Sequence, residues 1–304
     1  MAMASTLFFT IILLLIPGEA LAWGIGVHLQ LGSQTLEALS RLPGLLQPLL
    51  SNYPYDFLYG FISADITLGK KYTHYLKHCH SWRIGQQILA AAKTDSQRAC
   101  AYGYLGHLAA DTVAHSYMVP YKMVRTFNTA MLKHLYWEMR FESRVAPDIW
   151  QLARTIAQKD FRANDAMMSS VLSRTIFSFS TNKRLFNSIL LLSRLQRWQK
   201  MLQSIGEQSR WTLEEENQEE YLVLSQQATE SILTDMERSP FWKADPAGER
   251  ALYTAAIIRK NLNLLWLDGK LPEVEAQKLL AQLKIRFRQG ITNPEALLDL
   301  LAGY

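Results

Sequence analysis

Three side chains of metal-binding type are spaced four residues apart in an alanine- and leucine-rich segment, residues 97–117. On an α-helix each four-residue step turns by about 400°, so His107, Asp111 and His115 share one face. Two imidazoles and a carboxylate among small and apolar neighbours are costly to bury without a partner. Zn²⁺ is a natural partner, because it binds neutral imidazole nitrogen and carboxylate oxygen. The spacing indicates a metal site, although a single histidine on a helix face usually has only a structural role.

Further side chains of this type lie on either side of the segment. All seven histidines fall between positions 28 and 134, which predicts one site built from the N-terminal half. His134 and Glu138 are four residues apart, and Glu142 continues their face one helical turn later. Alone, such a pair is more often a surface hydrogen bond than a metal site, but beside His107, Asp111 and His115 it offers two further ligands. Upstream, metal ligation and a solvated polar cluster both remain open for Asp65, His74, His78 and His80.

The start of the chain predicts a secretory signal peptide. Residues 7–16, LFFTIILLLI, form an apolar run of about 10 residues, too short for a membrane span of about 20. Ala20-Leu21-Ala22 has the small-x-small pattern of a cleavage site, although no Lys or Arg precedes the run. We expect cleavage after Ala22 and a secreted or periplasmic mature protein without a transmembrane span. Trp23 would then have a free α-amino group, which can chelate a metal together with its carbonyl oxygen and the His28 imidazole; alternatively, Trp23 is an apolar anchor.

The elements that must position these residues are predicted to be helices. Apolar residues make up 49% and charged residues 19%, as in ordinary globular proteins, and the net charge of +5 is weak evidence for anionic partners. Helical periodicity dominates, which predicts an all-α fold. Residues 52–82 are expected to be mostly loop, and Pro120 is expected to end the helix of residues 97–117. Cys79 and Cys100 fit either one disulfide or two buried thiols. The other expected helices are 28–41, 126–144, 148–158, 166–204, 214–237, 246–266, 271–287 and 293–302.

The order of these residues resembles that in the zinc-dependent phospholipase C superfamily. This superfamily includes bacterial phospholipases C, the N-terminal region of glycosylphosphatidylinositol-specific phospholipase D and, more distantly, single-strand-specific zinc nucleases. The resemblance covers residues 23 to about 142. One departure is the spacing of Asp111 and His115, which are separated by three residues instead of the five in bacterial phospholipases and nucleases. Residues 166–240 form a helical extension without a counterpart. The resemblance rests on Trp23, His28, Asp65, His80-Ser81-Trp82, the segment GHLAADTVAHS and the His134–Glu138 pair.

The resemblance implies one multi-helix domain, residues 23–304, with three zinc ions in a cleft. The first zinc would bind Asp65, His80, His107 and Asp111. The second would bind His115, His134 and Glu138. The third would bind the Trp23 amino and carbonyl groups, His28 and Asp111, so that Asp111 bridges two ions. His78 is the alternative to His80.

The implied activity is hydrolysis of a headgroup phosphodiester in a phospholipid at a membrane surface. Asp65 is the expected catalytic residue, since a carboxylate at the edge of a metal cluster can orient or deprotonate the attacking water. Two alternatives stay open: a zinc-dependent nuclease acting on single-stranded nucleic acid, and an extracellular zinc-binding protein without catalytic activity.

Overall fold

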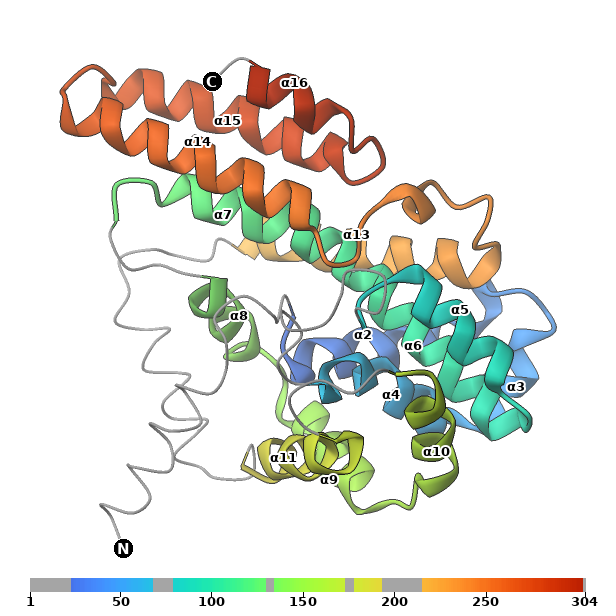
Figure 1. Ribbon diagram of the computed structural model, residues 1–304. Coiled ribbons are helices and arrows are strands. Elements are labelled where there is room, and N and C mark those ends of the chain that lie inside the picture. The colour runs from blue at the N-terminus through green and yellow to red at the C-terminus, as the bar shows by residue number, and fades with distance from the viewer. Residues whose placement is uncertain (1–22, 68–78, 130–133, 173–177, 193–214, 303–304) are drawn as a thin grey trace, which may run out of the picture.

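The protein is all-α, as the sequence predicts (Figure 1). The computed structural model describes residues 23–67, 79–129, 134–172, 178–192 and 215–302, and within these ranges it contains helices and no β-strand. The expected signal peptide, residues 1–22, lies outside the described residues. None of the helices in the described ranges is long and apolar enough to cross a membrane.

The helices follow one another through the described ranges. The first half comprises α2 (Ile25–Glu37), η1 (Leu39–Arg41), α3 (Leu46–Asn52), α4 (Pro54–Ser63), η2 (Ala64–Ile66), α5 (Trp82–Ala91), α6 (Asp95–Val113), the π-helical segment η5 (Ala114–Met118), α7 (Val119–Arg125) and α8 (His134–Glu142). The second half comprises α9 (Pro147–Gln158), α10 (Arg162–Val171), α11 (Phe179–Leu192), α13 (Glu215–Thr234), η6 (Pro240–Lys243), α14 (Glu249–Leu267), α15 (Glu273–Gly290) and α16 (Ala296–Ala302).

Helix α6 runs through the centre of the molecule and packs against α4, α13 and α5 (Figure 1). The approach of α4 to α6 is close enough to require glycine on both helices. A Cβ at Gly60 would lie 1.9 Å from the carbonyl oxygen of Cys100, and one at Gly103 would lie 2.0 Å from that of Phe57. Because α4 leads directly into η2, this close packing brings Asp65 beside the buried face of α6.

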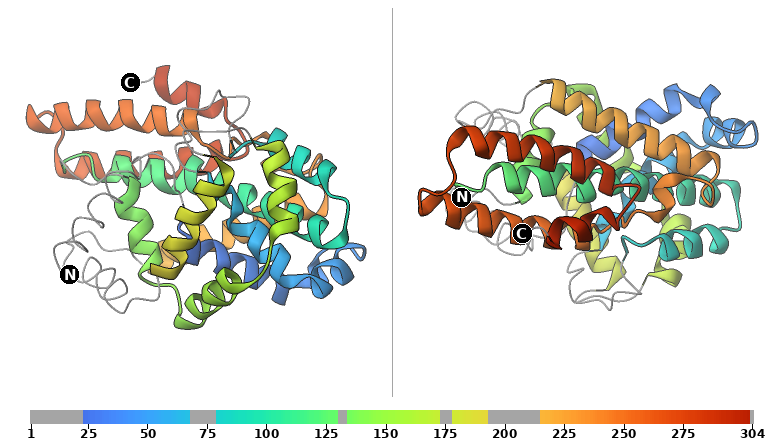
Figure 2. Two further views of the ribbon diagram at one scale, coloured as in Figure 1. Left: turned by 60° about the horizontal axis from the view of Figure 1, so that its bottom comes forward. Right: turned by 90° about the horizontal axis from the view of Figure 1, so that it is seen from above.

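Helices α14 and α15 form an antiparallel hairpin on the other side of the core. Both pack on α7 and η5, and the view from above shows them lying along α7 (Figure 2). The turn between them lies at one end of the molecule (Figure 1). Helix α16 closes the arrangement by packing on both members of the hairpin.

Several sequence-based expectations for individual elements are wrong. Pro120 does not end a helix, because η5 changes the hydrogen-bond register from i−4 to i−5 just before it, and Pro120 occupies the first turn of α7. Within the expected loop of residues 52–82, α4 is helical; it is buried on all sides from Phe57 onward and so lacks one-sided periodicity. Instead of one helix over residues 166–204, the described part of this range contains the end of α10, which stops at Val171, and the separate helix α11. Of the two possibilities left open for Cys79 and Cys100, the structure shows two free, buried thiols.

Candidate metal centre

Four imidazole rings meet at the carboxylate of Asp111 in the interior of the protein. The Oδ1 atom of Asp111 lies 3.3 Å from His28 Nε2. Its Oδ2 atom lies 3.0 Å from His80 Nε2, 3.2 Å from His107 Nε2 and 3.7 Å from His115 Nε2. All five side chains are buried. The i,i+4 spacing on α6 therefore does place His107 and Asp111 on one face, and other helices bring further histidines to it.

A second acidic side chain, Asp65, lies at the edge of this cluster. Its Oδ1 atom is 3.4 Å from His80 Nε2, and His80 Nε2 is in turn 3.1 Å from His107 Nε2. Within the part of the chain that the structure describes, two groups of three residues have donor atoms close enough together to hold a metal ion. One consists of His28, His107 and Asp111, and the other of Asp65, His80 and His107.

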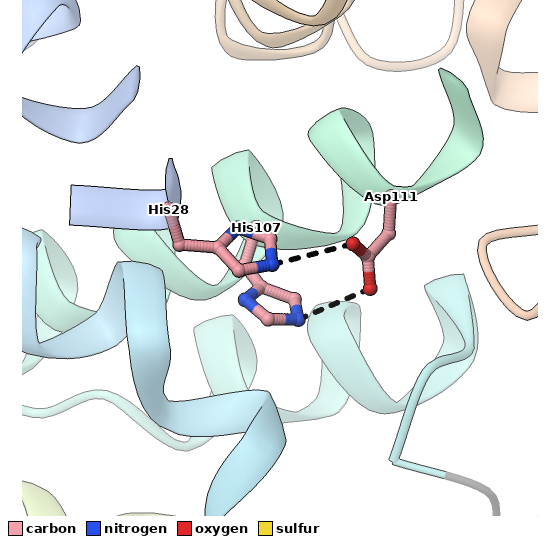
Figure 3. Close-up of side chains that lie close together, drawn as sticks. All are labelled: His28, His107 and Asp111. Carbon is pink, nitrogen blue, oxygen red and sulfur yellow. Dashed lines mark ion pairs between the residues drawn. The ribbon is translucent and has the colours of Figure 1, made fainter. Parts of the chain in front are cut away.

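The ligand-type residues come from four separate parts of the fold. His28 lies on α2, Asp65 in η2, His80 just before α5, and His107 and Asp111 on α6. The close-up shows the ring of His28 stacked on that of His107, with both Nε2 atoms directed at Asp111 (Figure 3). The two ring centroids are 3.8 Å apart and the planes differ by 17°.

The spacing of these atoms fits a zinc site. Donor atoms bound 2.0–2.1 Å from a tetrahedral zinc lie about 3.3 Å from one another, and most of the distances between the ring nitrogens and Asp111 are close to this value. His28 Nε2 and Asp111 Oδ1 are both buried and face each other at 3.3 Å without the geometry of a hydrogen bond. Unsatisfied polar atoms are costly in a protein interior, so their convergence is explained by a cation between them.

The protonation states also suit a cation. Burial and the neighbouring His28 lower the pKa of His107 to about 4, so its ring is neutral at pH 7. Burial raises the pKa of Asp111, but His107 and His28 outweigh it and hold that pKa well below its usual range. Neutral imidazole and ionised carboxylate are the forms that bind metals.

The main chain of α4 fixes the orientation of one ring. His107 Nδ1 lies 2.9 Å from the carbonyl oxygen of Phe61, which accepts a hydrogen bond when Nδ1 carries the proton. This leaves the Nε2 lone pair directed toward Asp111 and the cluster. Hydrogen bonds of this kind to the second ring nitrogen are a usual feature of metal-binding histidines.

The first turn of α2 is held against the cluster by two contacts. The indole of Trp23 is fully buried, and its Nε1 donates a hydrogen bond to the carbonyl oxygen of Ala110, 3.2 Å away and next to Asp111 in sequence. The carboxylate of Glu142 at the end of α8 accepts hydrogen bonds from the backbone N–H groups of Gly26 at 3.1 Å and Val27 at 2.9 Å. Glu142 thereby caps a helix whose own N-cap residue offers no side chain.

His115 is positioned by the π-helical segment and by a glycine far away in sequence. Gly248, the residue before α14, has a φ of 61° and lies directly against His115. A Cβ at this glycine would be 2.5 Å from both the Cβ and the carbonyl oxygen of His115. Positive φ and the lack of space both require glycine here.

A pocket of 520 Å³ opens beside His80. The indoles of Trp82 and Trp242 form a tilted pair with centroids 5.1 Å apart, and Trp82 Nε1 donates a hydrogen bond to the carbonyl oxygen of Ala244 at 2.8 Å. Besides the acidic side chains of Asp245 and Glu249, three cationic side chains share the lining, so the pocket beside the buried cluster is aromatic and of mixed charge, with one more cation than acids. The cations are Arg83, Lys243 and Arg250.

The structure brings together six of the nine residues expected as ligands, and it places a seventh beside them. The six are His28, Asp65, His80, His107, Asp111 and His115, and the seventh is Trp23. His134 and Glu138 belong to α8, but their side chains lie outside the described residues, as do His74 and His78 entirely.

Sequence reasoning missed three contributors to the site. The sequence placed Glu142 on the same helix face as His134 and Glu138, but it did not predict the hydrogen bonds of Glu142 with the first turn of α2. The Phe61 carbonyl and Gly248 carry no signal in a single sequence, since both act through backbone positions set by tertiary packing.

Comparison with known proteins agrees with this geometry. The sequence model of the family described as zinc-dependent phospholipase C matches residues 27–183, slightly more than half of the 304 residues. Searches of curated proteins and of solved structures find no match. The matched region contains Asp111 and the five ligand-type residues around it. It also extends beyond residue 142, where the motifs that carry the resemblance end. This chain therefore belongs to the zinc-dependent phospholipase C family.

Proposed function

We propose that this chain is a zinc-dependent phosphodiesterase that hydrolyses the headgroup phosphodiester of phospholipids outside the cytoplasm. The mature protein would comprise residues 23–304. The observation that carries the proposal is the convergence of four buried imidazoles on Asp111, with a second carboxylate, Asp65, at the edge of the same cluster. Family membership supports phospholipase C-like chemistry at such a centre.

The ligand assignment follows the family order. We assign one zinc to Asp65, His80, His107 and Asp111, whose donor atoms adjoin one another. A second ion would bind His115 together with His134 and Glu138. A third would bind His28, Asp111 and the Trp23 amino and carbonyl groups exposed by cleavage after Ala22; the burial of the Trp23 indole against α6 supports this assignment.

Three groups of the protein have separate roles in the proposed hydrolysis. When bound, zinc supplies positive charge that neutralises the phosphodiester and activates water. Asp65 orients the attacking water and accepts its proton, as its place at the edge of the cluster permits. The Phe61 carbonyl holds His107 in the tautomer that presents Nε2 to the cluster. Glu142 keeps the first turn of α2, and with it His28, in place.

The pocket beside His80 is the proposed substrate site. Its volume of 520 Å³ is of the size that small-molecule sites have. Its three cations, Arg83, Lys243 and Arg250, outnumber its two acids, Asp245 and Glu249, and supply positive charge for an anionic phosphodiester. The indoles of Trp82 and Trp242 supply apolar faces for the rest of the headgroup region. The pocket borders the candidate metal centre, since His80 belongs to both.

The test uses protein with an authentic Trp23 start and phosphatidylcholine as substrate. We expect three zinc ions per chain by metal analysis, release of phosphorylated headgroup, loss of release with a chelator, and recovery on adding zinc. Asp65→Asn should lower the rate by a factor of about 100 or more, as expected for loss of a general base. Asp148→Asn, which changes an exposed acid on α9, is the matched control and should stay within about twofold, as for other surface substitutions. Full activity after removal of all metal would refute the proposal.

A parallel assay with single-stranded DNA separates the enzymatic alternatives. The two indoles in the pocket are the kind of surface on which bases stack, so this substrate is a real competitor. Faster cleavage of DNA than of phospholipid would identify a nuclease. Bound zinc without hydrolysis of either substrate would identify a non-catalytic zinc protein.

A further inference from the structure

Helix α14 has an exposed face that is unusually apolar for a protein in water. Four residues spaced by seven, four and three positions, Tyr253, Lys260, Leu264 and Leu267, point in nearly the same direction on an α-helix. All four are exposed; Tyr253 is 65%, Leu264 51% and Leu267 72% accessible. The solvent-facing side of a surface helix normally carries polar residues. We define these four side chains as the α14 stripe.

Two further exposed apolar residues lie close to the α14 stripe in sequence. Leu265 is 39% accessible, and Val274 in the first turn of α15 is 63% accessible. Across the described chain, eleven large apolar residues are exposed, and five of them belong to this short stretch from Tyr253 to Val274. Such concentration marks an interaction surface, whereas scattered exposed leucines need no explanation.

The other end of α14 borders the proposed substrate pocket. Glu249 and Arg250 line that pocket and precede Tyr253 by four and three residues, so they lie on the same side of the helix as the stripe. A flat surface touching the whole stripe would therefore also come close to the pocket. The helix spans about 28 Å from the pocket to the turn, which is the length of 19 residues.

We propose that α14 docks along this stripe on the surface of a phospholipid bilayer, an inference that rests on the proposed lipid substrate. The exposed parts of its apolar side chains amount to roughly 400 Å², about half of what each partner of a stable dimer buries. A second copy of this chain is therefore a poorer occupant. A helix with apolar residues and lysine on its outer face, lying parallel to the membrane, is a known mode of interfacial binding.

The charges near the stripe indicate which kind of bilayer it fits. From α14 to the first turn of α15 the two signs balance, with four charges of each. The positive residues are Arg250, Arg259, Lys260 and Lys270, and the negative ones are Glu249, Asp268, Glu273 and Glu275. Docking by insertion of apolar side chains into a zwitterionic bilayer matches this balance, and anionic lipid should change the affinity by less than about threefold.

The proposal is tested by sedimentation with vesicles of palmitoyl-oleoyl phosphatidylcholine. The zinc-loaded mature protein should partition onto the vesicles, and the double variant L264S/L267S should partition at least tenfold less. The matched control L45S/L185S replaces two exposed leucines away from α14 and should bind like the wild type. Circular dichroism melting curves verify that both variants fold, as expected for exposed positions.

A second measurement separates this proposal from the proposed function. Hydrolysis of a short-chain phosphatidylcholine below its micelle concentration should be the same within twofold in L264S/L267S and wild type, while hydrolysis of vesicles falls with binding. Vesicle binding that is unaffected by L264S/L267S would overturn the docking role, as would a wild-type protein that hydrolyses the monomeric lipid but does not bind vesicles. A dimer that L264S/L267S dissociates would overturn it in favour of a second copy. Binding without hydrolysis of any phospholipid would refute the proposed function and leave the docking surface standing.

Discussion

The close contact between α4 and α6 gives the sharpest prediction, for the substitution Gly103→Ala. The added Cβ would lie 2.0 Å from the carbonyl oxygen of Phe57 and 2.9 Å from the backbone nitrogen of Phe61. Both neighbours are main-chain atoms of a helix and cannot move aside separately. Relief requires the two helices to separate by more than about 1 Å, since contacts of carbon with oxygen are normally longer than 3 Å.

The expected cost follows from two opposing effects. Overpacking of a core costs about 1–3 kcal/mol, and a clash with backbone belongs at the upper end of that range. Alanine gains about 1 kcal/mol over glycine from helix propensity. The free energy of unfolding of the metal-free protein should therefore fall by about 2 kcal/mol, measured by urea denaturation.

The same substitution should weaken zinc binding. Phe61 supplies the carbonyl oxygen that orients His107, and α4 leads to Asp65, so a displaced α4 disturbs both. Loss of such supporting contacts typically costs 10- to 100-fold in metal affinity, which a competition titration with a chromogenic chelator detects. Gly44→Ala is the control, because nothing lies within 4 Å of a Cβ there. If Gly103→Ala changed stability by less than about 0.5 kcal/mol, within the range of ordinary surface substitutions, and left zinc affinity unaltered, the inferred packing of α4 on α6 would be wrong.

Two further predictions concern pH and the contact at His115. Burial lowers the pKa of His107 to about 4, so the free energy of unfolding of the metal-free protein decreases through His107 as pH falls from about 6.5 to 4. Burial raises the pKa of Glu142 to about 7, so the free energy of unfolding increases through Glu142 as pH falls from about 7 to 4.5. Glu142→Gln should leave the His107 effect unopposed, and urea denaturation should then show a loss of about 3 kcal/mol between pH 6.5 and 4; a flat profile in the variant would contradict this. Gly248→Ala should destabilise by about 1–3 kcal/mol more than Gly269→Ala, because both glycines have positive φ but only the first also crowds His115. Equal melting temperatures for these two variants would show that the contact with His115 is not tight.

Local helix geometry made part of the site predictable. The positions of His107 and Asp111 on one face follow from their four-residue spacing, so a single sequence suffices to pair them. The position of the first turn of α2 next to Asp111 was expected from the resemblance, which assigned Trp23 and His28 to the same metal centre. Helices with one buried face, such as α9, were also predictable from their pattern; its observed bounds, Pro147–Gln158, differ by one residue from the expected range.

Features that depend on contacts between distant segments were not predictable. Helix α4 is buried on all sides, so its residues show no alternation of apolar and polar faces. The pocket beside His80 combines residues near Trp82 with residues near Trp242, which are 160 positions apart in the chain. The hydrogen bonds from Gly26 and Val27 to Glu142 likewise join segments more than 100 residues apart. Periodicity and spacing predict which residues are neighbours on one helix, but they do not predict contacts between helices that are distant in sequence.

The π-helical segment η5 has a consequence for how this site is maintained. A π-helical turn accommodates one residue more than the α-helix it interrupts, and its hydrogen bonds are less favourable. If the same residues continued from α6 into α7 as one regular α-helix, with no π-helical turn, every later side chain would face a direction rotated by about 100°. The packing of α7 against α14 and α15 would be lost with that rotation. The chain thus keeps a locally weaker helix as the joint that lets the metal-binding face of α6 and the hairpin-binding face of α7 point in different directions.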